Sequence, residues 1–105
     1  MEMSYTLYYA PDNANLAVRI ALEEMGAAYT HVLVDRSTYA QRSPDYLKLN
    51  PQGLLPVLID PAQDEPLFET GAILWHLADR HRALIPDSIA ARGLCLKWLF
   101  YISNT

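Results

Sequence analysis

The hydrophobic positions of this chain change their period along its length, and the changes predict alternating strands and helices. Residues 4–9 (SYTLYY) and 29–35 (YTHVLVD) are short runs rich in aromatic and β-branched residues, which is typical of strands. Between them the apolar positions from Asn13 onward have a helical period that ends at Gly26. We expect the packed face of this helix to consist of Leu16, Ala17, Ile20 and Ala21. The opening therefore predicts a parallel β-α-β unit with a right-handed crossover.

The middle of the chain is irregular, and a regular pattern then resumes. Residues 36–55 are mostly polar, with a short helix predicted over 45–49. Two short strands, 56–60 and 66–69, flank the turn-forming sequence PAQDE. Residues 70–81 then show one apolar stripe at helical spacing, made of Ile73, Leu74, Leu77 and Ala78. The order β-α-β-α-β-β-α predicts an α/β fold with a four-stranded mixed sheet.

A last helix is predicted over residues 89–103, with Asp87 or Ser88 as its N-cap. One side of it carries Leu94, Trp98, Tyr101 and Ile102, and this side is widened by Cys95, Leu99 and Phe100. A helix that is apolar over most of its circumference is normally buried. We therefore expect it to need more protein around it than this chain supplies.

Composition excludes several classes of function. The chain has 105 residues and a formal net charge of −4, and its lysines and arginines are scattered, which argues against binding to nucleic acid. No apolar run reaches membrane-spanning length. The single cysteine, Cys95, excludes an internal disulfide and a cysteine zinc cage, and the histidines show no metal-ligand spacing, so we expect no metal. A cytoplasmic protein is the default expectation.

Two neighbouring motifs carry candidate binding chemistry, and the first surrounds Pro56 in the sequence NPQGLLPVLID. Proline cannot donate a hydrogen bond to a sheet, so we expect Pro56 at an edge or in a special turn. If the Leu55–Pro56 bond is cis, the N–H and C=O of Leu55 are presented outward. A small peptide would then pair with Leu55 as an added strand.

The second motif is Glu69-Thr70, at the start of the helix predicted over 70–81. The free N–H groups of a helix start bind a carboxylate, the Thr70 hydroxyl adds a donor, and Glu69 binds an ammonium group. Together these groups suit the α-amino-acid end of a γ-glutamyl peptide. Helix capping is the commoner use of such residues. The occurrence of both motifs across one predicted hairpin is more specific than either alone.

Five segments of the chain resemble the N-terminal domain of cytosolic glutathione transferases of the bacterial beta, theta and nu types. They are LYYAP, VRIALEE, YTHVLVD, LNPQGLLPVL and ETGAILWHLADRH. The resemblance implies a thioredoxin-like domain over residues 1–83, with 84–105 as a linker and the truncated start of a helical domain. It implies that Leu55, a cis Pro56, Glu69 and Thr70 bind glutathione, and that the protein is a homodimer. Leu54 stands where relatives often have Lys or Gln.

The residue that would activate the glutathione thiol departs from the family pattern. The family has Ser or Cys in the turn before the first helix, or Tyr at the end of the first strand, whereas this turn reads APDNANLA. Asn13 and Asn15 are candidates because a side-chain amide donates hydrogen bonds, although both residue types also cap helices and form turns. Tyr8 stands near the family's tyrosine position, although an aromatic residue in this strand also suits the core.

Two functions remain open at this level. The first is a glutathione transferase, in which the ionised thiol of bound glutathione attacks a small electrophile or a disulfide. The alternative is a non-catalytic glutathione-binding or protein-interaction module of the same fold. The missing Ser and Cys favour the second function, and the intact motifs around Pro56 and Glu69 favour the first.

Overall fold

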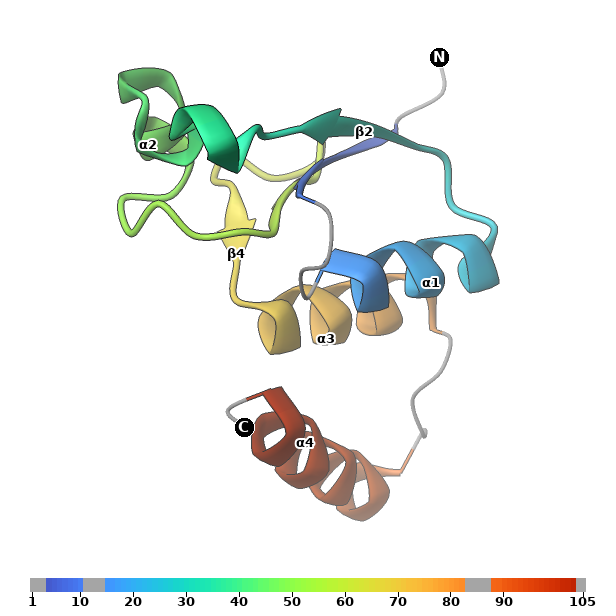
Figure 1. The fold of residues 1–105 in the computed structure, drawn as a ribbon. Coiled ribbons are helices and arrows are strands. Elements are labelled where there is room, and N and C mark those ends of the chain that lie inside the picture. The colour runs from blue at the N-terminus through green and yellow to red at the C-terminus, as the bar shows by residue number, and fades with distance from the viewer. Residues whose placement is uncertain (1–3, 11–14, 83–87, 104–105) are drawn as a thin grey trace.

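A computed structural model describes residues 4–10, 15–82 and 88–103, and its strands form one four-stranded sheet (Figure 1). The strands are β1 (Tyr5–Tyr9), β2 (Tyr29–Leu33), β3 (Val57–Ile59) and β4 (Leu67–Phe68), in the order β2-β1-β3-β4. β1 is parallel to β2 and antiparallel to β3, and β3 is antiparallel to β4. The predicted mixed sheet is confirmed. Each strand is one or two residues shorter than predicted, and most of the residues left out are polar or proline.

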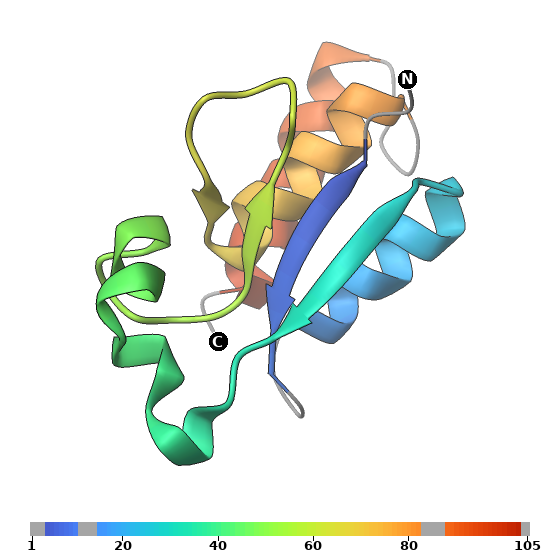
Figure 2. The same cartoon turned by 90° about the horizontal axis from the view of Figure 1, so that it is seen from above.

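Two helices, α1 (Asn15–Met25) and α3 (Thr70–His81), lie together on one face of the sheet (Figures 1 and 2). Two single-turn helices, η1 (Arg36–Thr38) and η2 (Ala40–Arg42), lead into α2 (Pro44–Leu49), which lies on the other side at one end of the sheet. The last helix, α4 (Ile89–Ser103), packs against α3. The predicted element order and the thioredoxin-like architecture are confirmed, and the predicted helix 70–81 has the bounds of α3.

Alternation along β1 divides the core into two parts. Tyr5 and Leu7 point toward α1 and α3, in a cluster that also contains Val18, Leu22, Leu58, Ile73 and Leu77. Tyr8 points the other way, toward a second cluster built around Val34, Tyr46 and Val57. Because side chains alternate along a strand, β1 contributes to both clusters. Helix α1 and the Tyr8 side chain are thus on different sides of the sheet.

The packed face of α1 differs from the prediction. Val18, Ala21 and Leu22 are buried, whereas Leu16 is 61% exposed and Ile20 is 55% exposed. The prediction was right for Ala21 and wrong for Leu16, Ala17 and Ile20. Both sets of residues have helical spacing, so α1 carries apolar side chains on two sides. The periodicity alone does not decide which side faces the sheet.

The last helix packs against the rest of the chain through the side that carries Cys95 and Leu99, and not through the side that carries Leu94, Trp98 and Tyr101. Cys95 and Leu99 are half-buried and line a hollow of about 200 Å³ together with side chains of α1 and α3. Leu94, Trp98 and Tyr101 are exposed, as expected for a helix that needs more protein around it. The Ser88 hydroxyl accepts a hydrogen bond from the Ala91 N–H at 3.1 Å, so Ser88 caps the helix. None of the described helices combines the length and apolar composition that crossing a bilayer requires.

Candidate functional site

The two sequence motifs are brought together by the β3–β4 hairpin. Val57 pairs with Phe68 in antiparallel register. The ladder ends at this pair, so Pro56 directly precedes one strand of the hairpin and Glu69 directly follows the other. Of the two places expected for Pro56, it occupies the turn: it directly precedes β3, which is an inner strand. The missing N–H of Pro56 therefore removes no hydrogen bond from the ladder.

The backbone of Leu55 presents polar groups that the fold does not use. The Leu55–Pro56 peptide bond is cis. Within residues 4–10, 15–82 and 88–103, neither the N–H nor the C=O of Leu55 has a hydrogen-bond partner. The preceding C=O, of Leu54, accepts hydrogen bonds from the Tyr46 hydroxyl at 2.6 Å and from Asn50 Nδ2 at 3.2 Å. The loop is thus fixed one residue before the groups that remain available to a ligand.

Glu69 has an uncommon backbone conformation at the junction of β4 and α3, with φ 75° and ψ 115°. A positive φ is unfavourable for residues other than glycine, and such strain occurs preferentially at functional sites. The Glu69 side chain is exposed and makes no capping hydrogen bond to α3. Nor does it pair with a cation in the part of the chain that the structure describes. The capping interpretation therefore does not account for Glu69.

The first turn of α3 offers free donors next to Glu69. The first hydrogen bond within the helix runs from the Ile73 N–H to the Glu69 C=O at 3.0 Å. The N–H groups of Thr70, Gly71 and Ala72 have no acceptor among the described residues. Gly71 is buried and Thr70 is half-buried. An anion at this helix start would therefore meet backbone donors and the positive end of the helix dipole.

The loop before Pro56 depends on residues that the sequence interpretation did not identify. Asn50 is buried, and its Oδ1 also accepts a hydrogen bond from the Gln52 N–H at 3.0 Å. Gly53 has φ 68°, and a Cβ there would lie 3.0 Å from the backbone O of Gln41. The signal in the sequence was the NPQG motif, because an Asn side chain that bonds its own backbone two residues on is typical of a turn.

Of the three candidate activating residues, the structure describes Tyr8 and Asn15, which belong to different elements. Tyr8 is half-buried, makes an edge-on contact with Tyr46 at a ring distance of 6.0 Å, and lines a hollow of about 320 Å³ beside α2. Burial, with a smaller contribution from Tyr8, raises the pKa of Tyr46. Asn15 is the first described residue of α1, on the opposite face of the sheet. Asn13 lies outside the described residues.

Comparison with known proteins identifies the family to which this fold belongs. Residues 3–79 match the family model of the glutathione S-transferase N-terminal domain. The chain belongs to the glutathione S-transferase family.

Three relatives show how the family varies around this domain. It is 34% identical over 100 residues to the disulfide-bond oxidoreductase YfcG of Escherichia coli, covering 90% of this chain and 46% of YfcG. It is 31% identical over 105 residues to the transcriptional regulator URE2 of Saccharomyces cerevisiae, covering 92% of this chain and 30% of URE2. A glutathione transferase from Burkholderia graminis, solved with two glutathione molecules per subunit, superposes with a TM-score of 0.88 at 38% identity. That match covers 93% of this chain and 42% of the solved one. This glutathione S-transferase chain thus spans less than half the length of each of these relatives.

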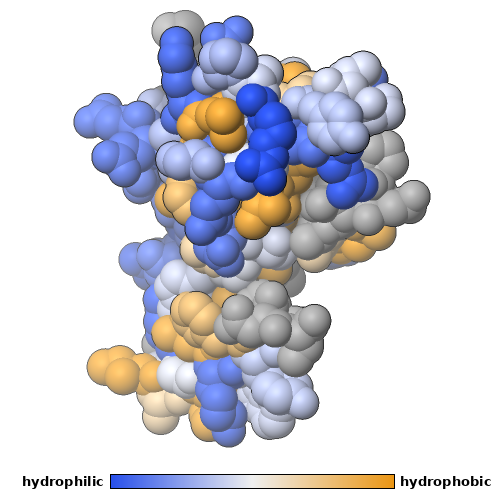
Figure 3. Space-filling view, turned by 60° about the vertical axis from the view of Figure 1, so that its left-hand side comes forward, coloured by the Kyte–Doolittle hydropathy of each residue, from blue (hydrophilic) through white to orange (hydrophobic). Residues whose placement is uncertain are grey.

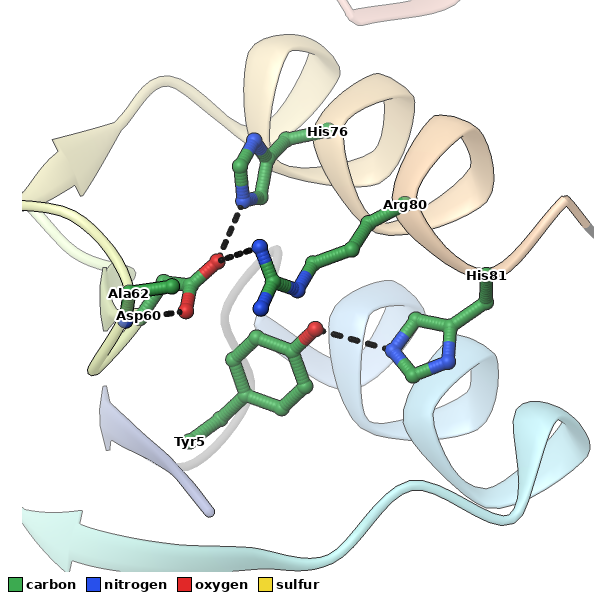
Figure 4. A network of polar contacts seen from close by, with 6 residues as sticks. All are labelled: Tyr5, Asp60, Ala62, His76, Arg80 and His81. Atoms are coloured by element: carbon green, nitrogen blue, oxygen red, sulfur yellow. Dashed lines mark hydrogen bonds and ion pairs between the residues drawn. The ribbon is translucent and has the colours of Figure 1, made fainter. Parts of the chain in front are cut away.

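A second polar cluster in the glutathione S-transferase domain was missed by the sequence interpretation (Figure 4). The buried carboxylate of Asp60 lies 2.8 Å from His76 Nε2 and 3.4 Å from an Arg80 guanidinium nitrogen. Nearby, the Tyr5 hydroxyl is 2.8 Å from His81 Nε2. The available signal was the spacing of His76 and Arg80, which puts both on one side of a helix. No group of three metal-ligating side chains occurs in the described portion of the chain.

Proposed function

We propose that this domain binds glutathione between Leu55-Pro56 and Glu69-Thr70. We further propose that, within a complete transferase, it presents the glutathione thiol for attack on an electrophile or a disulfide. The observation that carries the proposal is the set of unpartnered polar groups on facing ends of one hairpin. They are the N–H and C=O of Leu55, the Glu69 carboxylate, and the first N–H groups of α3.

Each of these groups suits one part of glutathione. The α-carboxylate of the γ-glutamyl end is an acceptor for the N–H groups at the start of α3 and for the Thr70 hydroxyl. The adjacent α-ammonium is a donor for the Glu69 carboxylate, in a charge-assisted hydrogen bond. The cysteinyl residue pairs its own N–H and C=O with those of Leu55, as an added strand does. Glutathione is thereby held at both its backbone and its charged end.

The chemical step that follows uses the substrate's thiol. Loss of the thiol proton to solvent leaves a thiolate. At a carbon electrophile it forms a thioether, either by displacing a leaving group that departs with its electron pair or by adding to an activated double bond that then takes a proton from solvent. At a disulfide it forms a mixed disulfide and releases the other thiolate. The domain contributes by stabilising the thiolate. The candidate groups are Asn15, Asn13, the amino end of α1 and Tyr8. A side-chain amide or hydroxyl donates a hydrogen bond to the thiolate without itself losing a proton.

A non-catalytic glutathione-binding or interaction module is the second candidate. It is favoured by the segment Ala10–Asn15, which contains no Ser, Thr or Cys, and by the similarity to a transcriptional regulator.

The two functions differ in the pKa of the bound thiol. We expect thiolate absorbance of bound glutathione to titrate at lower pH than that of free glutathione, and this shift to be lost in the Asn13→Ala, Asn15→Ala double variant. An unshifted titration in the wild-type chain favours the binding module. If the shift survives the double variant but is lost in Tyr8→Phe, Tyr8 is the residue that stabilises the thiolate.

The binding site itself is tested by Glu69→Gln. This change removes the charge while keeping the size of the side chain, and losing a charge-assisted hydrogen bond weakens binding by about 1.5–3 kcal/mol, or roughly 10- to 150-fold. Calorimetric titration of the 105-residue chain with glutathione measures the effect. Glu65→Gln is the matched control, because Glu65 is an exposed carboxylate in the connection between β3 and β4. Equal affinities of wild type and Glu69→Gln would remove Glu69 from the site.

A further inference from the structure

Asp60 lies beyond the end of β3 that is remote from the candidate glutathione site, yet its side-chain partners belong to the helix that begins at that site. Oδ2 is 2.8 Å from His76 Nε2 and 3.4 Å from an Arg80 guanidinium nitrogen, both on α3. Oδ1 accepts a hydrogen bond from the Ala62 N–H at 2.9 Å. Figure 4 shows the carboxylate pointing from the end of the strand toward α3. Asp60 thus ties the β3–β4 connection to the second and third turns of α3.

The contact is an ionic one made by a buried carboxylate. Asp60 is 1% exposed, and it is the one charged residue buried to this degree in the described part of the chain. Burial is the largest single influence on the pKa of Asp60 and raises it. The hydrogen bonds from Ala62 and His76 and the charge of Arg80 together outweigh burial and hold the pKa below its usual value. The carboxylate is therefore ionised at neutral pH, and its hydrogen bonds are charge-assisted.

These contacts lie farther along the same helix whose first turn forms part of the candidate site, so they influence where that first turn lies. His76 and Arg80 follow Glu69 by 7 and 11 residues, which corresponds to about 10 and 16 Å along the helix axis. Ile73 and Leu77 are fully buried beneath α3 and hold it against the sheet. Apolar contacts of this kind are non-directional, whereas hydrogen bonds weaken steeply when their geometry changes. The contacts of Asp60 with His76 and Arg80 therefore restrain the rotation and axial position of α3, together with the Tyr5–His81 contact near its end.

We propose that Asp60 is a positioning residue for the glutathione site. Through His76 and Arg80 it fixes α3, so that Glu69 and the first-turn N–H groups lie opposite Leu55. Both halves of the site are then positioned by one hairpin. Pro56 precedes β3, Asp60 follows β3, and Glu69 follows β4. This inference rests on the proposed binding of glutathione at Glu69.

A double-mutant cycle tests the proposal. Glutathione affinity is measured by NMR titration, which also reads weak binding, for the wild-type chain, Asp60→Asn, Glu69→Gln and the double variant. We expect Asp60→Asn to weaken binding by about 2- to 30-fold, the range produced by residues that act on a site without touching the ligand. In the Glu69→Gln background the same change should have a much smaller effect, because the group whose position Asp60 controls no longer makes its ionic contact.

Each outcome distinguishes the two proposals. An Asp60→Asn effect that is equal in both backgrounds indicates general destabilisation and overturns the positioning role, as does no effect in either. If Glu69→Gln still weakens binding in those cases, the proposed function stands. A wild-type chain that does not bind glutathione overturns both. Asp64→Asn, an exposed carboxylate in the same connection, is the matched control and should bind as wild type.

A second pair of variants covers the case in which Asp60→Asn does not fold, as judged by circular dichroism. Arg80 is 40% exposed, so replacing it leaves no buried cavity. In a chain that keeps Glu69, Arg80→Gln should weaken glutathione binding. Arg80→Lys keeps the cation and should retain most of the wild-type affinity. Wild-type affinity in Arg80→Gln, or a loss of equal size in both variants, contradicts the proposal.

Discussion

Glu69 combines an unfavourable backbone conformation with a side chain that makes no stabilising contact in the described protein. A φ of 75° costs a non-glycine residue on the order of 1–3 kcal/mol. Among the described residues, two others that are not glycine also have positive φ: Tyr39, at the end of η1, and Arg82, at the end of α3. Such left-handed residues are ordinary at helix ends, whereas Glu69 stands at the start of one. Nothing in the fold itself requires a carboxylate at this position, which is why we assign its role to a ligand.

Glu69→Gly should therefore raise stability and lower affinity at once. Glycine adopts a positive φ without a steric penalty, and its larger entropy in the unfolded chain offsets part of the gain. We expect the free energy of unfolding to rise by about 0.5–2 kcal/mol. Glutathione binding should fall as in Glu69→Gln. Denaturant unfolding and calorimetry measure the two effects.

Two controls separate the causes. Glu69→Gln keeps the strain and removes the charge, so its stability should be that of the wild type. Arg82→Gly relieves a positive φ at the end of α3, away from the site, and should stabilise the chain without changing its affinity. A Glu69→Gly variant that is less stable than the wild type would show that the conformation carries no strain.

At the scale of secondary structure, the positions of the helices and strands were predicted better than the contacts between them. The bounds of α3 followed from one apolar stripe, and the hairpin followed from the breakers between its strands. The face of α1 was mispredicted because Leu16 and Ile20 share the helical spacing of Val18 and Leu22, and only tertiary packing distinguishes the two sets. The contact of Asp60 with His76 joins residues from different elements, so the spacing of His76 and Arg80 on one side of a helix did not identify their partner. The candidate site was predictable because both of its halves are local motifs.

The tie between the β3–β4 connection and α3 predicts how stability depends on pH. Although burial opposes ionisation, hydrogen bonds and neighbouring cations lower the pKa of Asp60, so between that value and the ordinary value of about 4 the unfolded chain binds more protons. The free energy of unfolding should therefore fall as the pH falls through this interval. Asp60→Asn should cost about 1.5–3 kcal/mol at pH 7, as expected for a lost charge-assisted hydrogen bond, and should flatten the acid slope.

Urea unfolding of the wild type and Asp60→Asn, repeated from pH 7 down to pH 3, measures this dependence. Hydrogen bonds from Ser37 also lower the pKa of Asp35, which is fully exposed, so some slope should remain in the variant. Asp64→Asn serves as the matched control for removal of a carboxylate. An unchanged slope in Asp60→Asn would mean that the buried carboxylate does not contribute to acid unfolding.

At the scale of the whole molecule, the side of the chain that faces away from the sheet is incompletely covered. Large apolar side chains are exposed along α4, and Figure 3 shows hydrophobic surface over this helix at the bottom of the view. The exposed side of α1 and the hollow between α1, α3 and α4 add to this surface. The longer relatives contain more than twice the length of this chain. In the 105-residue chain, another surface must cover these side chains if they are to be buried.

We therefore expect the 105-residue chain to associate through α4. Leu94 is 57% exposed, Trp98 56% and Tyr101 63%, and burying a large apolar side chain contributes about 1.5–3 kcal/mol. Sedimentation velocity should show dimers or larger species whose fraction rises with protein concentration, because association is governed by mass action. The Leu94→Glu, Trp98→Glu double variant should shift the distribution toward the monomer, since association through α4 would bury unpaired charges.

Leu54→Glu is the matched control. Leu54 is 57% exposed but lies in the loop before Pro56, so this variant should associate as the wild type does. A wild-type chain that sediments as a monomer at micromolar concentration would show that the exposed side of α4 is tolerated in water.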